Sequence, residues 1–272
     1  MPHSSLNNNP SFRNLNLTTR CLGGPAGCAL ASRLAGSEKR PNVLLLEAGC
    51  RNDDPSLRVE GQRWTTFTTP GMNWGYKTTP QEHCNGRQID YARGKALGGS
   101  SSINFGVYTY GARDDYDEWA AAVEDDRFRW DRIQSRLKSL ETFDGAVAGK
   151  HNKYAAPKEA DHGLDGGLRV GYSTEWEQDL PLMMDIFEQA GFARNSDHNS
   201  GDPIGMSLVI NSSSKGKRTT AADLLKGASD NLTVITEAPV QRLVLDGKKV
   251  IGAESRGNRC KCNCGECART TS

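Results

Sequence analysis

The pattern of hydrophobic and polar positions predicts a protein of mixed α and β structure. Small and apolar residues run from Pro25 to Ala35 and are followed by Gly36, which is typical of a helix of about three turns. The apolar run Val43–Glu47 comes after Pro41 and is typical of a strand buried in a parallel sheet. A glycine turn, a helix and such a strand together predict part of a βαβ unit.

The same pattern predicts further elements downstream, separated by loops. Helices with one apolar stripe and a charged face are predicted over Asp114–Val123, Asp131–Leu140 and Pro181–Ala190. Strands are predicted over Leu232–Thr236, Val240–Leu245 and Lys249–Glu254. The last two strands are joined at Asp246-Gly247, a strong hairpin signal. Residues 50–92 and 144–167 are rich in turn-forming residues and predict irregular loops.

Composition and charge narrow the class of protein. The 272 residues leave room for one large domain or two modest ones. With 34 Lys+Arg against 33 Asp+Glu, the net charge of +1 gives no electrostatic argument for a nucleic acid or an anionic membrane as partner. No apolar run approaches the roughly 20 residues that span a bilayer, and residues 1–20 contain no signal-peptide pattern. We expect a soluble protein, cytoplasmic or peroxisomal if this N-terminus is genuine and secreted if it is wrongly assigned.

Two groups of cysteines differ in their spacing. Four are scattered singly, as is typical of reduced thiols: Cys21, Cys28, Cys50 and Cys84. Four others form the pattern C-x-C-x-C-x-x-C within the last 13 residues: Cys260, Cys262, Cys264 and Cys267. Four thiolates could bind zinc, copper(I) or an iron–sulfur centre. The cluster lacks paired C-x2-C knuckles and surrounding apolar residues, so an unstructured tail is the favoured interpretation and no metal site is assigned.

The first glycine turn is a candidate dinucleotide site. The N-terminus of a helix presents unpaired N–H groups and a positive dipole end to a pyrophosphate, and glycines let the phosphate approach. In the pattern G-x-G-x-x-G, Gly24 and Gly27 occupy the second and third positions, beside Gly23, while Leu22 replaces the first glycine. Glu47, 20 residues after Gly27, is placed to accept hydrogen bonds from a ribose. The alternative is a helix packed closely through glycines, with Glu47 as a surface charge.

Two features before this helix predict a weakened turn. The segment 16–22 is too polar for a buried central strand. A Cβ-bearing residue such as Leu22 is expected to be strained at the first glycine position and to project toward the pyrophosphate. Both features are expected to weaken cofactor binding.

A second glycine- and serine-rich segment carries a more specific signal. It reads R-G-K-A-L-G-G-S-S-S-I-N from Arg93 to Asn104. Gly98 and Gly99 would let the backbone approach a flat cofactor, and Ser100, Ser101 and Asn104 would supply hydrogen bonds to it. Without further information this is a glycine turn before a helix.

This signature resembles that of the glucose–methanol–choline (GMC) oxidoreductases, a family of flavoenzymes. The resemblance covers about residues 23–256 and continues through several short segments: Asn73–Tyr76, Thr79–Gln81, Tyr116–Trp119, Pro203–Gly205, Arg218–Thr220 and Asn231–Val234. It implies an α/β, Rossmann-like FAD-binding domain with part of a mixed α+β substrate domain. The chain would be an N-terminal fragment with atypical ends.

The resemblance also implies a division of the chain and a set of cofactor-binding residues. The expected parts are a flexible tail (1–20), an FAD-binding part (21–110), a partial substrate region (111–200), a return to the FAD-binding domain (201–258) and a cysteine-rich tail (259–272). By resemblance, Arg93, Ser100, Asn104, Phe105, Gly106 and Val107 line the flavin. Val240 matches the position whose backbone meets the adenine. With the residues of the two glycine segments, the expected FAD site comprises Gly23, Gly24, Gly27, Glu47, Arg93, Gly98, Ser100, Asn104, Phe105, Gly106, Val107 and Val240.

The activity implied by the resemblance is FAD-dependent oxidation of the CH–OH group of a small-molecule alcohol, with oxygen or another electron acceptor. In the family a histidine in the C-terminal part accepts the hydroxyl proton, and this chain does not reach that motif. The five histidines are interpreted as loop or surface residues, and no catalytic base is assigned: His3, His83, His151, His162 and His198. The alternatives are a non-catalytic nucleotide-binding remnant and a metal-binding protein acting through its cysteine cluster.

Overall fold

A computed structural model describes residues 19–147 and 149–255 of the chain, which form two units. The first unit takes the described residues up to 57, residues 63–104 and the described residues from 220 onward. The second takes residues 58–62 and 105–219. Most of the expected flexible tail (1–20) and all of the expected cysteine-rich tail (259–272), with His3 and the cluster Cys260–Cys267, lie outside the described residues. Thr19 and Arg20, expected in the flexible tail, belong to a strand because they pair with residues 43 and 44.

The first unit contains a parallel sheet, one long helix and a C-terminal hairpin. Its elements are β1 (Thr19–Leu22), α1 (Pro25–Ala35), β2 (Val43–Leu46), α2 (Arg63–Thr68), η4 (Glu82–Cys84), η5 (Gly99–Ser102), η9 (Ala221–Leu225), β8 (Leu232–Ile235), β9 (Val240–Asp246) and β10 (Lys249–Ser255). A further short helix, η2 (Pro55–Arg58), lies where the chain leaves the unit.

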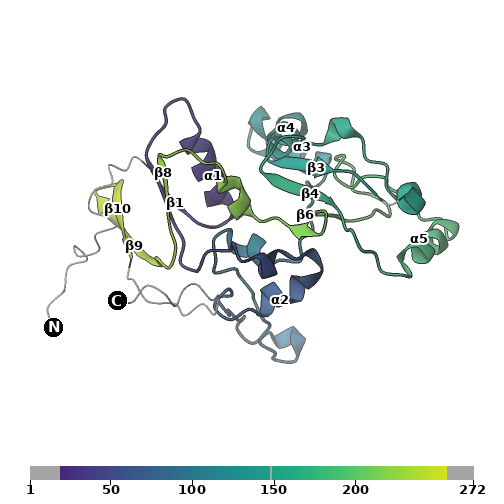
Figure 1. Cartoon of the computed structure of the whole chain (residues 1–272), viewed down its shortest axis with the longest axis horizontal. Coiled ribbons are helices and arrows are strands. Elements are labelled where there is room, and N and C mark those ends of the chain that lie inside the picture. The colour runs from purple at the N-terminus through teal and green to yellow at the C-terminus, as the bar shows by residue number, and fades with distance from the viewer. Residues whose placement is uncertain (1–18, 148, 256–272) are drawn as a thin grey trace. The chain divides into compact units, whose positions relative to one another are not determined.

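The sheet has the strand order β1-β2-β8, and both pairs are parallel. It joins segments from opposite ends of the sequence, as the purple β1 and the green β8 show in Figure 1. Leu22 pairs with Leu46, and Leu46 pairs with Ile235. The expectation of a poor first strand was wrong in one respect, because β1 forms despite its polar residues. In the described part of the chain β1 pairs only with β2, and the backbone ladder does not require apolar side chains.

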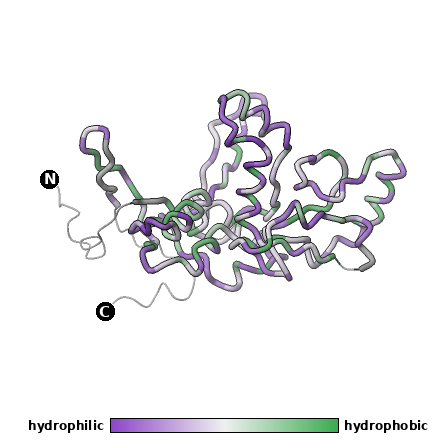
Figure 2. The backbone as a smooth tube through the Cα atoms, turned by 90° about the horizontal axis from the view of Figure 1, so that it is seen from above, coloured by the Kyte–Doolittle hydropathy of each residue, from purple (hydrophilic) through white to green (hydrophobic). Residues whose placement is uncertain are grey.

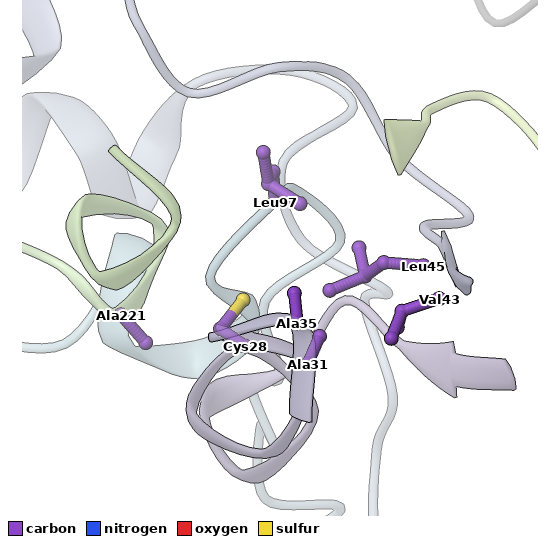
Figure 3. Close-up of a cluster of buried hydrophobic side chains, with 7 residues drawn as sticks. All are labelled: Cys28, Ala31, Ala35, Val43, Leu45, Leu97 and Ala221. Carbon is purple, nitrogen blue, oxygen red and sulfur yellow. The ribbon is translucent and has the colours of Figure 1, made fainter. Parts of the chain in front are cut away.

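Helix α1 packs on this sheet through small residues. Cys28, Ala31 and Ala35 recur at helical spacing and are fully buried. They pack in one cluster with Val43 and Leu45 of β2 (Figure 3). Leu44 and Leu46, which alternate with these residues along β2, pack with Ala238 in a separate cluster. The strand is therefore buried on both faces, as its continuous apolar run predicted.

The second unit contains a mixed sheet and three longer helices. Its elements are η3 (Glu60–Gln62), α3 (Arg113–Ala122), η6 (Asp126–Phe128), α4 (Trp130–Lys138), β3 (Glu141–Asp144), η7 (Gly149–Tyr154), η8 (Glu159–Asp161), β4 (Leu168–Tyr172), α5 (Leu180–Gln189), β5 (Ile210–Asn211), β6 (Ser213–Ser214) and β7 (Lys217–Arg218). The sheet order is β3-β4-β5, with β3 and β4 parallel and β4 and β5 antiparallel. Strands β6 and β7 form a separate short hairpin.

The boundaries of this unit differ from the division expected from the sequence. Besides residues 58–62, the unit takes residues 105–219, whereas the expected region spans 111–200. The physical reason is strand pairing: β5 pairs with β4, and the backbone N–H of Tyr108 donates to the carbonyl of Ile210. These contacts attach the segments around Tyr108 and Ile210, which lie outside the expected region, to the rest of the unit.

The elements predicted from periodicity lie close to where they were expected. Helices α3, α4 and α5 each begin and end one or two residues before the predicted bounds. The hairpin β9–β10 pairs Asp246 with Lys249, so Gly247 and Lys248 form the turn. Hydrophobic and hydrophilic positions are interspersed along the backbone (Figure 2). No helix within the described residues is long and apolar enough to cross a membrane.

Candidate nucleotide-binding site

The first glycine turn connects β1 to the N-terminus of α1. The N–H of Gly23 donates to the carbonyl of Leu46, and α1 then begins at Pro25 with Gly24 as its N-cap. No side chain caps this terminus by a hydrogen bond. The first N–H groups of a helix have no partner within it, and together with the helix dipole they favour an anion at this end.

The two glycines at the start of α1 have different surroundings. A Cβ on Gly27 would lie 1.6 Å from the carbonyl oxygen of Leu22, so the close packing of α1 on β1 excludes any side chain there. A Cβ on Gly24 would meet nothing within 4 Å. The space beside Gly24 is therefore open at the positive end of the helix. A pyrophosphate would fit in this space, and a methyl group on residue 24 would occupy it instead.

The strain expected at Leu22 is not present. Leu22 is the last residue of β1 and is not among the described residues with positive φ. Its side chain is 63% exposed. The close approach in this turn involves the carbonyl oxygen of Leu22, which any residue carries. A leucine is therefore compatible with the turn, and replacing it with glycine is not expected to relieve strain.

The second glycine segment packs directly on the first. The N–H of Gly98 donates to the carbonyl of Gly23 over 2.8 Å. A Cβ on Gly99 would lie 2.8 Å from the Cα of Gly24 and 2.9 Å from the Cδ of Pro25. Gly98 and Gly99 also have φ values of +96° and +56°, which favour glycine. The two glycine-rich segments thus pack together at one place in the first unit.

The first two serines of η5 form hydrogen bonds with backbone groups outside this helix. Ser100 Oγ accepts a hydrogen bond from the N–H of Gly94. Ser101 Oγ donates to the carbonyl of Gly98 and accepts from the N–H of Ala221. Ser101 therefore binds the protein's own backbone instead of supplying the expected bond to a cofactor. Ser100 is the acceptor in its hydrogen bond with Gly94, so its hydroxyl hydrogen takes no part in that bond.

Glu47 is a buried residue of the site and not a surface charge. It follows β2 directly and is 7% exposed. Its Oε1 accepts a hydrogen bond of 2.8 Å from the N–H of Gly49, and a Cβ on Gly23 would lie 2.5 Å from its Oε2. Burial raises the pKa of Glu47 to about 7, against the opposing effects of the N–H groups of Gly49 and Ala48 and the charge of Lys95.

The segment before Val240 lies at the end of the sheet where Glu47 follows β2. The N–H of Ala238 donates to the carbonyl of Glu47, and the N–H of Glu237 donates to the carbonyl of Gly49. Val240 then begins β9 and packs partly buried against the cluster that contains Leu46. The carboxyl ends of β1, β2 and β8 therefore meet at the glycine turn, the usual position of ligands in open α/β sheets.

Arg93 and Asn104 lie at the exposed ends of the second segment. The guanidinium of Arg93 stacks over the ring of Tyr91 at 3.7 Å and donates to the carbonyl of Ala92. The backbone N–H of Asn104 donates to the carbonyl of Ser100, and its side chain is exposed. Both residues belong to the first unit.

Phe105, Gly106 and Val107 belong to the second unit. Gly106 has a φ of +84°, and its carbonyl accepts hydrogen bonds from the N–H and the hydroxyl of Ser212. Phe105 and Val107 have exposed side chains. The exposed side chains of Phe105 and Val107, on either side of Gly106, thus form a small apolar surface on this unit.

His162 lies in a loop, one of the two expected locations, but it is not on the surface. Its side chain is completely buried between Glu141 and Asp197. His198 is half-buried, and its ring nitrogens lie 3.2 Å from the carbonyl oxygens of Leu208 and Tyr108. Nothing in the glycine-rich stretch around His162 signalled burial, because its two acidic partners are distant in sequence. Among the described residues, no group of three or more His, Cys, Asp or Glu side chains could hold a metal ion.

Comparison with known proteins identifies the family. A family model described as GMC oxidoreductase matches residues 22–265. The chain belongs to the GMC oxidoreductase family. The family and the α/β fold expected from the R-G-K-x-L-G-G-S-S-x-x-N signature are thereby confirmed.

Several GMC proteins are similar over most of this chain. Pyridoxine 4-oxidase from Microbacterium luteolum is 34% identical over 242 residues, which are 86% of this chain and 45% of the relative. The alcohol dehydrogenase [acceptor] of Pseudomonas putida is 34% identical over 84% of this chain and 40% of its own length. Pyranose dehydrogenase of Agaricus campestris is 34% identical over 83% and 38%. The chain thus spans less than half the length of these relatives.

Solved structures show the same fold. The pyridoxine 4-oxidase of Mesorbium loti superimposes with a TM-score of 0.74 at 28% identity, over 88% of this chain and 47% of that protein. A fungal aryl-alcohol oxidase gives a TM-score of 0.76 at 21% identity, over 88% and 42%. An FAD-dependent oxidoreductase from Chaetomium thermophilum gives 0.75 at 23%, over 88% and 41%. These likenesses show that the chain has the fold of these proteins.

Proposed function

We propose that this chain binds FAD and is the cofactor-binding part of an oxidoreductase that acts on the CH–OH group of an alcohol. The observation that carries the proposal is the packing of Gly98 and Gly99 on the glycine turn, with an open space beside Gly24. The names of the relatives, which include a pyridoxine oxidase and an alcohol dehydrogenase, support an alcohol as the substrate class. Oxygen or another acceptor would take the electrons.

The residues of the first unit fit the parts of FAD. The N-terminus of α1 would bind the pyrophosphate at Gly24, because its N–H groups and dipole favour negative charge. Glu47 would accept hydrogen bonds from the ribose hydroxyls, and the segment at Val240 would lie against the adenine. Ser100 and Asn104 would donate to the flavin. When bound, FAD supplies a ring that accepts a hydride from the alcohol carbon.

A matched pair of glycine variants tests the pyrophosphate site. Gly24→Ala places a methyl group in space that the protein leaves open, so the chain should fold normally. We expect FAD to bind at least about tenfold more weakly, equivalent to about 1.4 kcal/mol, because the methyl group occupies the cradle. Quenching of flavin fluorescence on titration measures the affinity.

The second member of the pair, Gly61→Ala in the second unit, is the control for Gly24→Ala. A Cβ there also meets nothing within 4 Å, and its backbone is not in the left-handed region. Gly61→Ala should bind FAD as the wild type does. Equal affinity of all three proteins would place the pyrophosphate elsewhere, and no binding by the wild type would refute the proposed function. Oxidation of an alcohol by the FAD-loaded chain distinguishes a complete enzyme from a nucleotide-binding remnant.

The affinity for FAD should also depend on pH through Glu47. Ribose hydroxyls donate only to the ionised carboxylate, and the pKa of this buried group in the free protein is about 7. Below pH 7 a proton must therefore leave before FAD binds, and the affinity should fall by up to about tenfold per pH unit. Isothermal titration between pH 5.5 and 8.5 measures this slope.

Glu47→Gln is the matched variant for this slope. It retains an acceptor for the N–H of Gly49 but has no charge to titrate. At pH 8 it should bind FAD about 10- to 100-fold more weakly, because it loses hydrogen bonds to a charged acceptor. Its affinity should not change with pH. The free variant should also melt at a higher temperature than the wild type at pH 8, because a buried charge is removed. A wild-type slope that persists in Glu47→Gln would assign the titration to another group.

A further inference from the structure

Helix α5 of the second unit has two apolar sides, and only one of them is buried. Met184 is buried and Leu180 is partly buried in a cluster with Tyr154 and Val170. The other side is exposed at the periphery of the unit, where Figure 1 shows α5. Positions i, i+1, i+4 and i+5 lie on one side of an α-helix. On α5 these positions carry four large, exposed apolar side chains: Leu182, Met183, Ile186 and Phe187.

The exposed apolar side extends beyond the end of the helix. The backbone N–H of Phe192 donates to the carbonyl of Phe187, and the two rings meet edge to face at a centroid distance of 5.6 Å. Phe192 is exposed as well. A helix that is apolar on both sides is typical of one that is covered on both sides. We call the five exposed side chains the apolar stripe: Leu182, Met183, Ile186, Phe187 and Phe192.

The area of the apolar stripe suits a short partner segment. Its side chains are 42–60% exposed. At about 200 Å² for a whole side chain of this size, the stripe offers about 500 Å² of apolar surface. This equals the largest apolar patch of a typical monomer, about 300–600 Å², which is often functional. A stable dimer buries about 800 Å² on each partner. The stripe is therefore too small to hold a second copy of the chain and large enough for one short helix.

The charge around the stripe is negative. The segment 174–189, which contains α5, has five Asp and Glu residues and no Lys, Arg or His. Two of its carboxylates are neutralised by neighbouring cations on the polar side of the helix. Asp185 forms ion pairs with Lys153 and Arg194, and Glu188 forms one with Arg194. The negative charge that remains lies in the three residues before α5.

These three acidic residues are Glu175, Glu177 and Asp179, and all are exposed. None of their carboxylates forms an ion pair with a residue that the structure describes. Asp179 is the N-cap residue of α5, but its side chain makes no capping hydrogen bond. Three carboxylates beside an apolar surface attract a cationic partner and repel an anionic one. A second copy of the segment would add the same negative charge, so charge disfavours it as area does.

We propose that the apolar stripe and the three carboxylates before it form a docking surface for a basic amphipathic helix of a partner protein. The apolar side chains of that helix would lie along the stripe, and its lysine or arginine side chains would lie beside Glu175, Glu177 and Asp179. This is the common mode in which an amphipathic helix binds an apolar surface. The docking surface belongs entirely to the second unit, and its role does not depend on FAD.

Two synthetic peptides test the chemistry of the partner. The basic probe LKKLLKLLKKLLKL forms a helix with leucine on one face and lysine on the other. The acidic probe has glutamate in place of every lysine and keeps the leucine face. We expect the full chain to bind the basic probe in the micromolar range and the acidic probe at least about tenfold more weakly. Fluorescence anisotropy of labelled peptide at nanomolar concentration measures both affinities. Equal affinities, or no binding of the basic probe, would overturn the proposal.

A matched pair of double variants tests the apolar stripe. Leu182→Gln/Ile186→Gln makes the stripe polar without touching a buried residue, so the chain should fold as the wild type does. It should bind the basic probe at least about tenfold more weakly. The control Leu243→Gln/Leu245→Gln changes two exposed leucines of β9 and should bind as the wild type does. A folded stripe variant with the wild-type affinity would overturn the proposal.

The carboxylates are tested separately by neutral variants. Glu175→Gln/Glu177→Gln/Asp179→Asn should bind the basic probe about five- to tenfold more weakly. Raising the salt concentration from about 0.05 to 0.5 M should weaken binding by the wild type to a similar extent and change that of the variant little. An unchanged affinity and salt dependence in this variant would overturn the choice of a basic partner.

The control for the charge variant is a triple change on α3. Three exposed acidic residues there are replaced by the matching amides, and binding of the basic probe should stay as in the wild type: Asp114→Asn, Asp115→Asn and Glu118→Gln. An equal loss of affinity in this control would show that the probe responds to charge anywhere on the chain, and would overturn the assignment to α5.

Two other occupants of the apolar stripe would give different results. Sedimentation of the chain alone should show a monomer up to about 100 μM, as the small area of the stripe requires. A dimer that Leu182→Gln/Ile186→Gln abolishes would assign the stripe to a second copy and overturn the proposal. Vesicles of phosphatidylcholine should not bind the chain in a flotation assay. Vesicle binding that the same variant abolishes would assign the stripe to a membrane surface and overturn the proposal as well.

Discussion

Gly27→Ala is expected to prevent the first unit from folding stably. The new Cβ would lie 1.6 Å from the carbonyl oxygen and 2.8 Å from the carbonyl carbon of Leu22, and both are backbone atoms. Helix α1 would have to move away from β1, which would open the cluster around Cys28, Ala31 and Val43. We expect a loss of about 3 kcal/mol or more of unfolding free energy, at the upper end for an overpacked site. Urea unfolding followed by circular dichroism measures it.

Gly24→Ala and Gly61→Ala serve as controls for this effect, because neither Cβ meets an atom within 4 Å. Both should unfold within about 0.5–1 kcal/mol of the wild type, and either can gain slightly because alanine restricts the unfolded chain. A Gly27→Ala variant with the wild-type midpoint would show that α1 does not pack on β1 as closely as the structure has it. Gly24→Ala should differ from the wild type in FAD binding alone.

Where periodicity was clear, the sequence predicted the fold well. Helix α1 has the bounds expected from Pro25 and Gly36, and the continuous apolar run of β2 correctly indicated burial on both faces. These elements are determined by local signals, namely a proline at the first turn, small residues on one face and a glycine after the last turn. Most of the candidate residues of the first unit also lie at one end of the sheet, because parallel strands end at the same edge.

Where tertiary contacts decide the structure, the sequence alone was insufficient. Strand β1 forms from polar residues because it pairs with β2, which sequence periodicity does not register. The strain expected at Leu22 depends on a backbone conformation that the residue does not adopt. Ser101 looked like a cofactor ligand but binds the carbonyl of Gly98 and the N–H of Ala221, 120 residues away. Spacing along the chain carries no information about such distant partners.

His162 is the clearest example of a residue whose partners cannot be predicted from their spacing along the chain. Its neighbours in sequence are glycines and charged residues, which indicate a surface loop. Glu141 and Asp197 lie 21 and 35 residues away, and only the folded second unit brings them to the two ring nitrogens. A buried ion cluster of this kind has no local pattern, because its members come from a strand and two loops.

The stability of the second unit should fall between pH 6.5 and pH 9 because of His162. The folded state raises the pKa of this histidine from 6.5 to about 9, so the folded protein holds a proton that the unfolded chain has released in this range. The stabilisation is therefore fully present below pH 6.5 and is lost as the pH rises through 9. For one proton over this interval the loss is about 3 kcal/mol, at about 1.4 kcal/mol per pH unit.

Glu47 in the first unit has a separate pH range. Its pKa rises from 4.5 to about 7 on folding, so its burial lowers stability progressively between these values. The fall above pH 7 can therefore be assigned to His162, and Glu47→Gln should retain it. Denaturant unfolding at half-unit pH steps from 5 to 10, with Glu47→Gln and His162→Gln in parallel, separates the two contributions.

The difference in unfolding free energy between the wild type and His162→Gln should be largest near pH 6.5. There the wild type has an imidazolium between Glu141 and Asp197, whereas the variant leaves two buried carboxylates without a cation, which is costly. Above pH 9 the wild-type ring is neutral as well, so the difference should shrink by about 3 kcal/mol. His83→Gln should follow the wild type throughout. A difference that stays constant from pH 6 to 10 would mean that His162 is neutral in the folded protein and that the cluster is held by hydrogen bonds without the imidazolium charge.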